Sequence, residues 1–493
     1  MQSRFQRWGG VLAAITLLSA VSDELSAKTN FVFFIADDVS PEDLGCYGHP
    51  HIQTPNIDAL AAGGLRFTQA YLTTSSCSPS RCSILTGRYP HNTGAPELHT
   101  SLPDSQIRFP ELLREAGYYT VLSGKNHMVG SKEDRAFDHI TSGGGPGKEE
   151  DWVEHVEKRP TEKPFFFWFA SSDAHRTWSV SQDLPTYTTD QVVVPPFLID
   201  DEATREDLAL YYHEITRFDH FIGKVVEELK EQGVFEQTLI FVMADNGRPF
   251  PRSKTLLYDS GIRTPFVISY PEGIQQPAVT DRLVSALDVS ATILEAAGIS
   301  DRPTIQGLPL QPLFTDPTAT VREVVFAEHN WHVHKNHERM VRWGDWLYIK
   351  NNYPDQANLC VEAYKFPAGE SLWKAHAEGR TNEQQQQIFA NPSPEEQLFR
   401  VSKDPHQLTN LASLPEVAPQ LKVAREALRV WTEETGDTIP ANPTGDRDLP
   451  PRIVNGEVLP GKGKAVPGWT HGEMAGDATN AGEMLAKGPA KLP

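Results

Sequence analysis

The chain has few cysteines, no glycosylation acceptor and no excess of positive charge. Its 493 residues include only Cys46, Cys77, Cys82 and Cys360, too few for a disulfide framework in so long a chain. Every Asn-x-Ser/Thr triplet has proline in the middle, which favours a bacterial periplasm over a eukaryotic secretory route. The formal net charge of −20 argues against a nucleic-acid partner.

Long hydrophobic runs are also missing. The run at 9–21 is too short to span a bilayer. Arg4 and Arg7 precede it and small residues follow it, which is typical of a secretory signal. We therefore expect a signal peptide at 1–27, no membrane span, and a mature protein exported to a bacterial periplasm or secreted.

Short apolar runs alternate with helical patterns over most of the chain. Apolar residues at every third or fourth position predict an amphipathic helix at 205–232, and Gly233 follows as a stop. Strands alternating with helices predict an α/β layered domain at 28–320. The runs rich in β-branched and aromatic residues, which predict buried strands of a parallel sheet, are 31–36, 118–122, 165–170, 239–244 and 265–270.

The pattern of apolar and polar residues changes after residue 320. Short apolar runs at 345–350 and 396–401 predict strands, and a helix is predicted near 415–434. We expect a smaller α+β domain at 321–437. The remainder, 438–493, is rich in Pro, Gly and Ala, and we expect a tail that packs on the body or stays mobile.

Polar residues follow four of the predicted strands. Ligands of open α/β sheets bind outside the carboxyl ends of the strands, so these residues predict a single site. In chain order they are Asp37, Asp38, Lys125, His127, His175, Asp245 and Asn246.

Two adjacent pairs among them, Asp37-Asp38 and Asp245-Asn246, supply only oxygen ligands. Such a site suits a hard divalent cation, Ca²⁺ or Mg²⁺, rather than zinc. Taken alone, either pair is more typical of a helix cap or a turn. With both pairs following strands, and together with the cysteine motif at 77–88, a metal site is the prediction.

One motif stands out, Cys-Ser-Pro-Ser-Arg-Cys-Ser-Ile-Leu-Thr-Gly-Arg at 77–88. A helix is predicted to start at Cys77, with Pro79 in its first turn, and its positive end would stabilise an anion. The alternative is a buried Cys beside a surface Arg, which describes Cys82 better. The motif resembles the signature of the type I sulfatases, and 397–412 resembles the C-terminal signature of that family.

This resemblance covers 30 to about 412 and implies an alkaline-phosphatase-like fold. Such a fold has a large mixed, mostly parallel sheet sandwiched by helices, and a smaller C-terminal α+β domain. It also implies that a formylglycine-generating maturation enzyme converts Cys77 to formylglycine (3-oxoalanine), whose hydrate is the nucleophile. The two acidic pairs and residue 77 would then hold Ca²⁺, with Mg²⁺ as the alternative.

The resemblance also assigns roles to single residues. The stretch Gly-Lys-Asn-His at 124–127 is similar to the sulfatase element Gly-Lys-Trp-His, with Asn126 in place of Trp. The implied roles are Arg81 steadying the nucleophile, Lys125 and Lys254 binding sulfate, His127 bonding to the hydrate, and His175 protonating the leaving group.

Two further stretches, 174–176 and 245–258, are similar to the N-sulfoglucosamine sulfohydrolase (heparan N-sulfatase) branch, which usually has Arg in place of Lys254. The aromatic and histidine-rich segment at 326–342 has a counterpart there. It is predicted either to contact a sugar or to be a surface loop. Its candidate contacts are Trp331, His332, His334, His337 and Arg339.

The sequence therefore predicts a sulfatase that hydrolyses O-sulfate esters or N-sulfate from a sulfated glycan. A sulfamidase for N-sulfated glucosamine is the narrower alternative. A phosphohydrolase of the same superfold would share the metal and the sheet. A chain whose Cys77 is not matured would be a non-catalytic glycan-binding protein.

Overall fold

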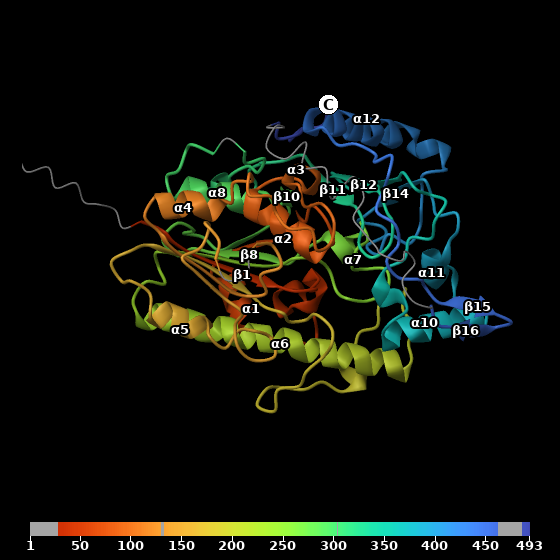
Figure 1. The fold of residues 1–493 in the computed structure, drawn as a ribbon, viewed down its shortest axis with the longest axis horizontal. Helices are drawn as coiled ribbons and strands as arrows, with labels where there is room; N and C mark the ends of the chain where they lie inside the picture. The colour runs from red at the N-terminus through yellow and green to blue at the C-terminus, as the bar shows by residue number, and fades with distance from the viewer. Residues whose placement is uncertain (1–27, 130–132, 303, 462–485) are drawn as a thin grey trace, which may run out of the picture.

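The computed structural model describes residues 28–129, 133–302, 304–461 and 486–493 (Figure 1). The expected signal peptide at 1–27 lies outside these residues, and the tail at 438–493 is described only in part. Within the described ranges, no helix has both the length and the apolar character that crossing a bilayer requires. All four cysteines are free of disulfides.

The central sheet has eight strands in the spatial order β5-β4-β6-β1-β7-β8-β2-β9. The neighbours β4, β6, β1 and β7 are parallel, whereas β8 is antiparallel to β7 and to β2. The predicted mixed, mostly parallel sheet is confirmed, with the fifth predicted run as an antiparallel member. The strands are β1 (Asn30–Ala36), β2 (Leu65–Phe67), β4 (Tyr119–Gly124), β5 (His139–Thr141), β6 (Phe165–Ala170), β7 (Thr238–Ala244), β8 (Phe266–Ser269) and β9 (Ala278–Thr280).

Helices cover both faces of this sheet, α2, α4 and α8 on one side and α1, α5 and α6 on the other (Figure 1). Alternate residues of β1, such as Phe33 and Phe34, pack into the two separate cores. Because both faces are buried, the central strands β1, β6 and β7 are almost entirely apolar. The helices are α1 (Pro55–Ala62), α2 (Cys77–Thr86), α3 (Pro90–Thr93), α4 (Phe109–Glu115), α5 (Trp152–Glu157), α6 (Glu202–Glu231), α7 (Asp259–Ile262), α8 (Asp288–Ala296) and α9 (Gln311–Thr315).

The longest helix, α6, begins three residues before its predicted start. The Asp201 carboxylate accepts the N–H of Thr204 over 3.0 Å and so caps the first turn. The helix ends just before Gly233, whose φ of 67° lies in the left-handed region. Its apolar stripe packs on the sheet as the periodicity predicted.

A second, four-stranded antiparallel sheet follows in the chain, in the order β11-β12-β13-β14. One face packs on α12, and the other packs on Tyr71 and on residues of the 256–262 region of the first unit. The predicted strands at 345–350 and 396–401 correspond to β13 and β14. The domain boundaries themselves stay a prediction. The elements are β11 (Val324–His329), β12 (Glu338–Trp343), β13 (Trp346–Asn351), β14 (Glu396–Arg400), α10 (Pro367–Ala377), α11 (Glu383–Gln386) and α12 (Ala418–Thr435).

Two small strand pairs complete the described fold. They are β3 (Ala70–Tyr71) with β10 (Val284–Ser285), and β15 (Arg452–Val454) with β16 (Glu457–Leu459). The described parts of the tail contact the body, since the Glu323 N–H donates to the Ala490 carbonyl over 2.7 Å and the Thr444 hydroxyl donates to Glu97.

Candidate active site

The two acidic pairs meet at the carboxyl ends of β1 and β7, which are neighbouring parallel strands. The Asp38 N–H donates to Asp245 Oδ1 over 3.2 Å, and the side-chain amide of Asn246 donates to Asp38 Oδ1. All four side chains, including Asp37, are fully buried. Strand order thus brings together residues that lie more than two hundred positions apart in the chain.

Cys77 is the first residue of α2 and lies against these pairs. The ligand atoms of Asp37, Cys77 and Asp245 all lie within 4.8 Å of one another. The helix starts here because Ser76 is extended, and Gly87 ends it in a left-handed conformation. Burial raises the pKa of the Cys77 thiol to about 12, so the unmodified side chain would be a neutral thiol and a poor nucleophile.

A cation faces each of the three carboxylates. Burial and the charges of Asp37 and Asp245 raise the pKa of Asp38, even though Lys254 opposes them. At Asp37 the cations, Lys125 first, outweigh burial and lower the pKa of the carboxyl. The pairs are Arg81 with Asp245 (Nε to Oδ2, 2.7 Å), Lys254 with Asp38 (Nζ to Oδ2, 2.6 Å) and Lys125 with Asp37.

Two buried oxygens of this cluster, Asp37 Oδ1 and Asn246 Oδ1, have no hydrogen-bond partner. Buried acceptors without partners are rare, because burying them without compensation costs free energy. Carboxylate and amide oxygens are the donors that Ca²⁺ and Mg²⁺ prefer. The donor set of Asp37, Asp38, Asp245 and Asn246 therefore fits a hard divalent cation.

Asp37 also lines a cavity of about 530 Å³. On its wall, His127 Nε2 and His99 Nδ1 share a hydrogen bond of 2.7 Å, and the His99 N–H donates to the Ser78 hydroxyl over 2.8 Å. Four of the predicted site residues, Asp37, Lys125, His127 and His175, line this one space. Its lining includes Asp37, His99, Lys125, Asn126, His127, Lys148, Asp173, His175, Arg176 and Glu214.

The two predicted catalytic imidazoles are neutral in this setting. The Lys254 ammonium, followed by burial, lowers the pKa of His175 to about 3. Burial, followed by Lys125, lowers the pKa of His127 to about 2. His175 Nδ1 hydrogen-bonds to the Arg176 carbonyl, which leaves its Nε2 as an acceptor.

His332, in the connection between β11 and β12, lies beside the start of α2. Its Nδ1 shares a 2.7 Å hydrogen bond with the Ser76 hydroxyl. Burial, followed by the Lys254 charge, lowers the pKa of His332. It therefore lies close to the residues predicted to handle sulfate.

The structure does not bring the other candidate sugar contacts to the cavity. Trp331 is 2 % exposed, and its indole donates to the Gly445 carbonyl over 2.8 Å. Arg339 donates to Asp437, Asn330 and the Glu338 carbonyl, and His334 bonds to a tyrosine hydroxyl. His337 Nε2 lies 2.8 Å from Arg339 Nη2 and 3.0 Å from the Thr438 carbonyl oxygen, so this ring is also held within the protein. The reason is that this segment forms β11, β12 and their connection, so these side chains serve packing. We do not carry them into the proposed site.

Two cavity residues, His99 and Lys148, were not singled out from the sequence. Neither follows a strand at the carboxyl edge; both lie in loops, with φ of 66° and 65°. Non-glycine residues at positive φ are uncommon and give no signal in the sequence. Asn126, in place of the family Trp, accepts the N–H groups of Met128 and Val129 and so fixes the loop after β4.

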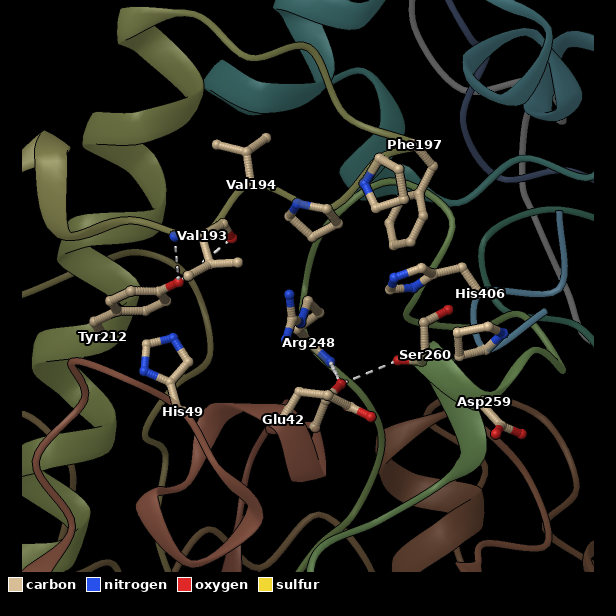
Figure 2. Close-up of a pocket in the computed structure, with 14 residues that line it drawn as sticks. Glu42, His49, Val193, Val194, Phe197, Tyr212, Arg248, Asp259, Ser260 and His406 are labelled. Atoms are coloured by element: carbon tan, nitrogen blue, oxygen red, sulfur yellow. Dashed lines mark hydrogen bonds between the residues drawn. The ribbon is translucent and has the colours of Figure 1, made fainter. Parts of the chain in front are cut away.

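Figure 2 shows a second, smaller pocket of about 170 Å³, in which the Arg248 side chain lies between His49 and His406. None of the site residues predicted from the sequence lines it, whereas Asp37, Lys125, His127 and His175 line the larger cavity. Arg248 donates to Asp43 over 2.7 Å, so its charge already has a partner. The chemistry-bearing residues point to the larger cavity as the active site.

Comparison with known proteins decides the family. The Sulfatase family profile matches residues 29–299, which is more than half of the chain. This chain belongs to the sulfatase family. The sulfatase is 29 % identical over 471 residues to human N-sulphoglucosamine sulphohydrolase, covering 84 % of this chain and 92 % of that protein. It is 28 % identical over 453 residues to an ulvan-active sulfatase of Formosa agariphila, covering 80 % and 74 %.

A solved structure of a protein in complex with its substrate D-glucosamine-2-N,6-O-disulfate has the same fold, with a TM-score of 0.65 at 19 % identity over 82 % of this chain and 98 % of that one. The sulfatase is a sulfuric ester hydrolase of the alkaline phosphatase superfamily. The matched range contains both acidic pairs, Cys77 and Lys254, and it ends before the 326–342 segment.

Proposed function

We propose that this sulfatase is exported and removes sulfate from a sulfated carbohydrate, using formylglycine at position 77 and Ca²⁺. The observation that carries the proposal is the position of Cys77, within 4.8 Å of Asp37 and Asp245. Asp37 lines a cavity of about 530 Å³, which has room for a sugar. A buried thiol would be a poor nucleophile, which supports conversion of Cys77.

When bound, Ca²⁺ supplies a Lewis acid for the sulfate, and formylglycine supplies a hydrated aldehyde whose hydroxyl is the nucleophile. The two acidic pairs would hold the cation. Lys125 and Lys254 bind the sulfate oxygens, since both ammonium groups lie against this cluster. Arg81 is buried and bonded to Asp245, so it presents a fixed positive charge beside residue 77.

The neutral imidazoles move the protons. His127 Nδ1 is buried without a partner, and the bond from Nε2 to His99 orients the ring, so Nδ1 can accept a proton from the nucleophile. Lys254 is the largest cause of the low pKa of His175. An anionic sulfate against Lys254 offsets that charge, which raises the proton affinity of His175 and lets it protonate the leaving oxygen or nitrogen.

The substrate class is supported by the printed names of two relatives, an ulvan-active sulfatase and N-sulphoglucosamine sulphohydrolase. A sulfamidase for N-sulfated glucosamine is the second candidate. It is favoured by the similarity at 245–258 and 174–176 and by the alignment over 92 % of the human enzyme. Lys254, where that branch usually has Arg, keeps O-sulfate esters in the proposal.

Export to a bacterial periplasm or the medium is supported by the basic and then apolar N-terminal sequence at 1–27. The proposal also requires a formylglycine-generating maturation enzyme as a transient partner, because an unmodified Cys77 lacks the second hydroxyl of the hydrate.

The test combines mass and activity. Protein made in a host with the maturation enzyme should give a residue-77 peptide lighter than the cysteine form by about 18 Da. It should release sulfate from at least one sugar in a screen of sulfated disaccharides that includes N-sulfated glucosamine. It should leave 4-nitrophenyl phosphate intact. Full desulfating activity with an intact Cys77 would contradict the mechanism, and glycan binding without sulfate release would contradict the function.

A further inference from the structure

A glycine-rich loop, Gly-Gly-Gly-Pro-Gly-Lys-Glu at 143–149, brings Lys148 to the wall of the active-site cavity. The loop is held against the end of β6. The Gly147 carbonyl accepts the Ser172 N–H over 2.8 Å and the Ser171 hydroxyl over 3.2 Å. Ser171 also donates to the carboxylate of Glu149, which is buried. The residues on both sides of Lys148 are therefore anchored.

The backbone around Lys148 is packed without space for adjustment. A Cβ added to Gly143 would lie 2.0 Å from the Lys148 carbonyl oxygen. A Cβ added to Gly124, at the end of β4, would lie 1.9 Å from the Ala170 carbonyl oxygen and 3.2 Å from that of Lys148. Lys148 itself has a φ of 65°, which only a well-determined surrounding maintains in a non-glycine residue. The loop thus holds one lysine in a fixed position at the cavity.

The other cations at this cavity already have acidic partners. Lys125 pairs with Asp37, and Arg176 forms a bidentate pair with Asp207 at 2.5 and 2.7 Å. Within the described ranges, Lys148 alone among the lysines and arginines that line the cavity forms no ion pair.

The acidic residues that line the cavity are also paired with cations. Asp173 and Glu214 both bind Arg217, at 2.6 Å and 3.1 Å. In a chain with a net charge of −20, a half-buried lysine left without an acid on a cavity wall is placed for an anion from outside.

We propose that Lys148 binds a second acidic substituent, a sulfate or a carboxylate, on the sugar that carries the scissile sulfate or on the sugar joined to it. This inference rests on the proposed function. Lys125 and Lys254 bind the sulfate that is removed, and Lys148 binds the charge that stays. The enzyme therefore selects sugars that are acidic at two positions.

The experiment compares kcat/KM for matched sugars. Glucosamine-2-N-sulfate and glucosamine-6-O-sulfate carry one acidic group, and glucosamine-2-N,6-O-disulfate carries both. An N-sulfated glucosamine joined to a uronic acid supplies the carboxylate case. In the wild type, at least one doubly acidic sugar should exceed its singly acidic match at least tenfold, because a charge-assisted contact is made to only one of them.

Three variants locate the effect. Lys148→Gln should reduce that ratio at least tenfold, and Lys148→Arg should keep most of it because it keeps the charge. Lys224→Gln removes an equal charge from the exposed surface of α6 and should leave both kcat/KM values within twofold. Loss of the ratio for the disulfate identifies the sulfate as the ligand, and loss for the uronate identifies the carboxylate.

Two results would overturn the proposal. If Lys148→Gln lowers kcat/KM equally for singly and doubly acidic sugars, or leaves the ratio unchanged, Lys148 does not select a second charge. If the wild type carrying formylglycine releases no sulfate from any of these sugars or from the disaccharide screen, the proposed function fails and this inference fails with it. Sulfate release with a ratio independent of Lys148 overturns this inference alone.

Discussion

Among the residues that the structure describes, two buried clusters have the geometry of a metal site, Asp37–Cys77–Asp245 and His91–Glu328–Asp437. In each, the three ligand atoms lie within 4.8 Å of one another. They differ in what surrounds them. The first keeps a carboxylate oxygen, Asp37 Oδ1, without a partner and reaches the cavity. The second is closed by protein groups.

In the second cluster, every carboxylate oxygen of Glu328 and Asp437 has a hydrogen-bond partner. His91 Nδ1 bonds to one oxygen of Glu328 over 2.8 Å, and Asn330 donates to the other over 2.9 Å. Both oxygens of Asp437 accept from Arg339, at 2.6 and 2.8 Å. This cluster ties α3 and β11 to the chain just after α12, so its role is structural. Distance alone does not identify a functional site; acceptors without partners beside a cavity do.

The largest expected difference between the clusters is in activity. Cys77→Ser should lower sulfate release about 10³-fold or more, because a serine hydroxyl cannot supply the hydrated aldehyde. The free energy of unfolding should change by less than about 1.5 kcal/mol, since the side chains are similar in size. Turnover of 4-nitrophenyl sulfate and urea denaturation measure the two effects. Residual activity above a few per cent would assign the nucleophile elsewhere.

The structural cluster should show the reverse. Arg339→Met leaves Asp437 buried without its partner and should destabilise the fold by about 3–5 kcal/mol, while kcat per folded molecule stays near the wild-type value. Arg429→Met on the exposed face of α12 is the control and should cost less than about 0.5 kcal/mol. Equal losses for both variants would show that the buried pair stabilises no more than a surface pair.

Metal dependence should separate the clusters next. At a Ca²⁺ concentration of about 100 times its Kd, the wild type should gain about 2.7 kcal/mol against unfolding. Asn246→Ala removes a ligand oxygen and should reduce this gain, whereas Glu328→Gln should retain all of it. Thermal unfolding with Ca²⁺ and with a chelator measures the gain. If Glu328→Gln abolished the stabilisation by Ca²⁺, the cation would bind at the His91–Glu328–Asp437 cluster instead.

The smallest effect concerns two buried histidines with opposite responses to pH. Burial would lower the pKa of His91, but Glu328 and Asp437 raise it above its ordinary value. Its contribution is therefore fully present below about pH 6.5 and is lost as pH rises through the folded pKa. Burial and Lys254 lower the pKa of His332, so its effect has the other sign: stability falls as the pH drops below about 6.5.

Stability measured from pH 8 to pH 5 tests this contrast. The difference between wild type and His91→Gln should grow towards pH 5, and the difference between wild type and His332→Gln should shrink, each by about 1 kcal/mol. If both differences in stability stayed constant with pH, neither histidine would have a pKa that differs between the folded and the unfolded chain.

The sequence predicted the catalytic edge well because strand order there follows from local apolar runs. The strands β1, β6 and β7 are almost entirely hydrophobic, β4 contains a shorter apolar run, and polar residues follow the end of each, so the pattern was enough to single out Asp37, Lys125 and Asp245. The motif at Cys77 indicated the nucleophile and therefore the type of reaction.

The remainder depends on contacts that local patterns do not encode. The aromatic segment at 326–342 was predicted either to contact a sugar or to be a surface loop, but its two ends pair as β11 and β12 in a sheet that also contains the distant strand β14. His99 and Lys148 reach the cavity through loops at positive φ, which leave no periodic signal. Such residues are identified only once the cavity is known and the side chains that line it are inspected.

The burial of α2 limits when residue 77 can be modified. All ten of its residues are buried, and Cys77 is only 2 % exposed. The maturation enzyme proposed above would have no access to Cys77 once this helix is docked. Under the proposed function, conversion of Cys77 therefore comes before α2 docks on the body, and a chain that folds with an unmodified Cys77 stays inactive.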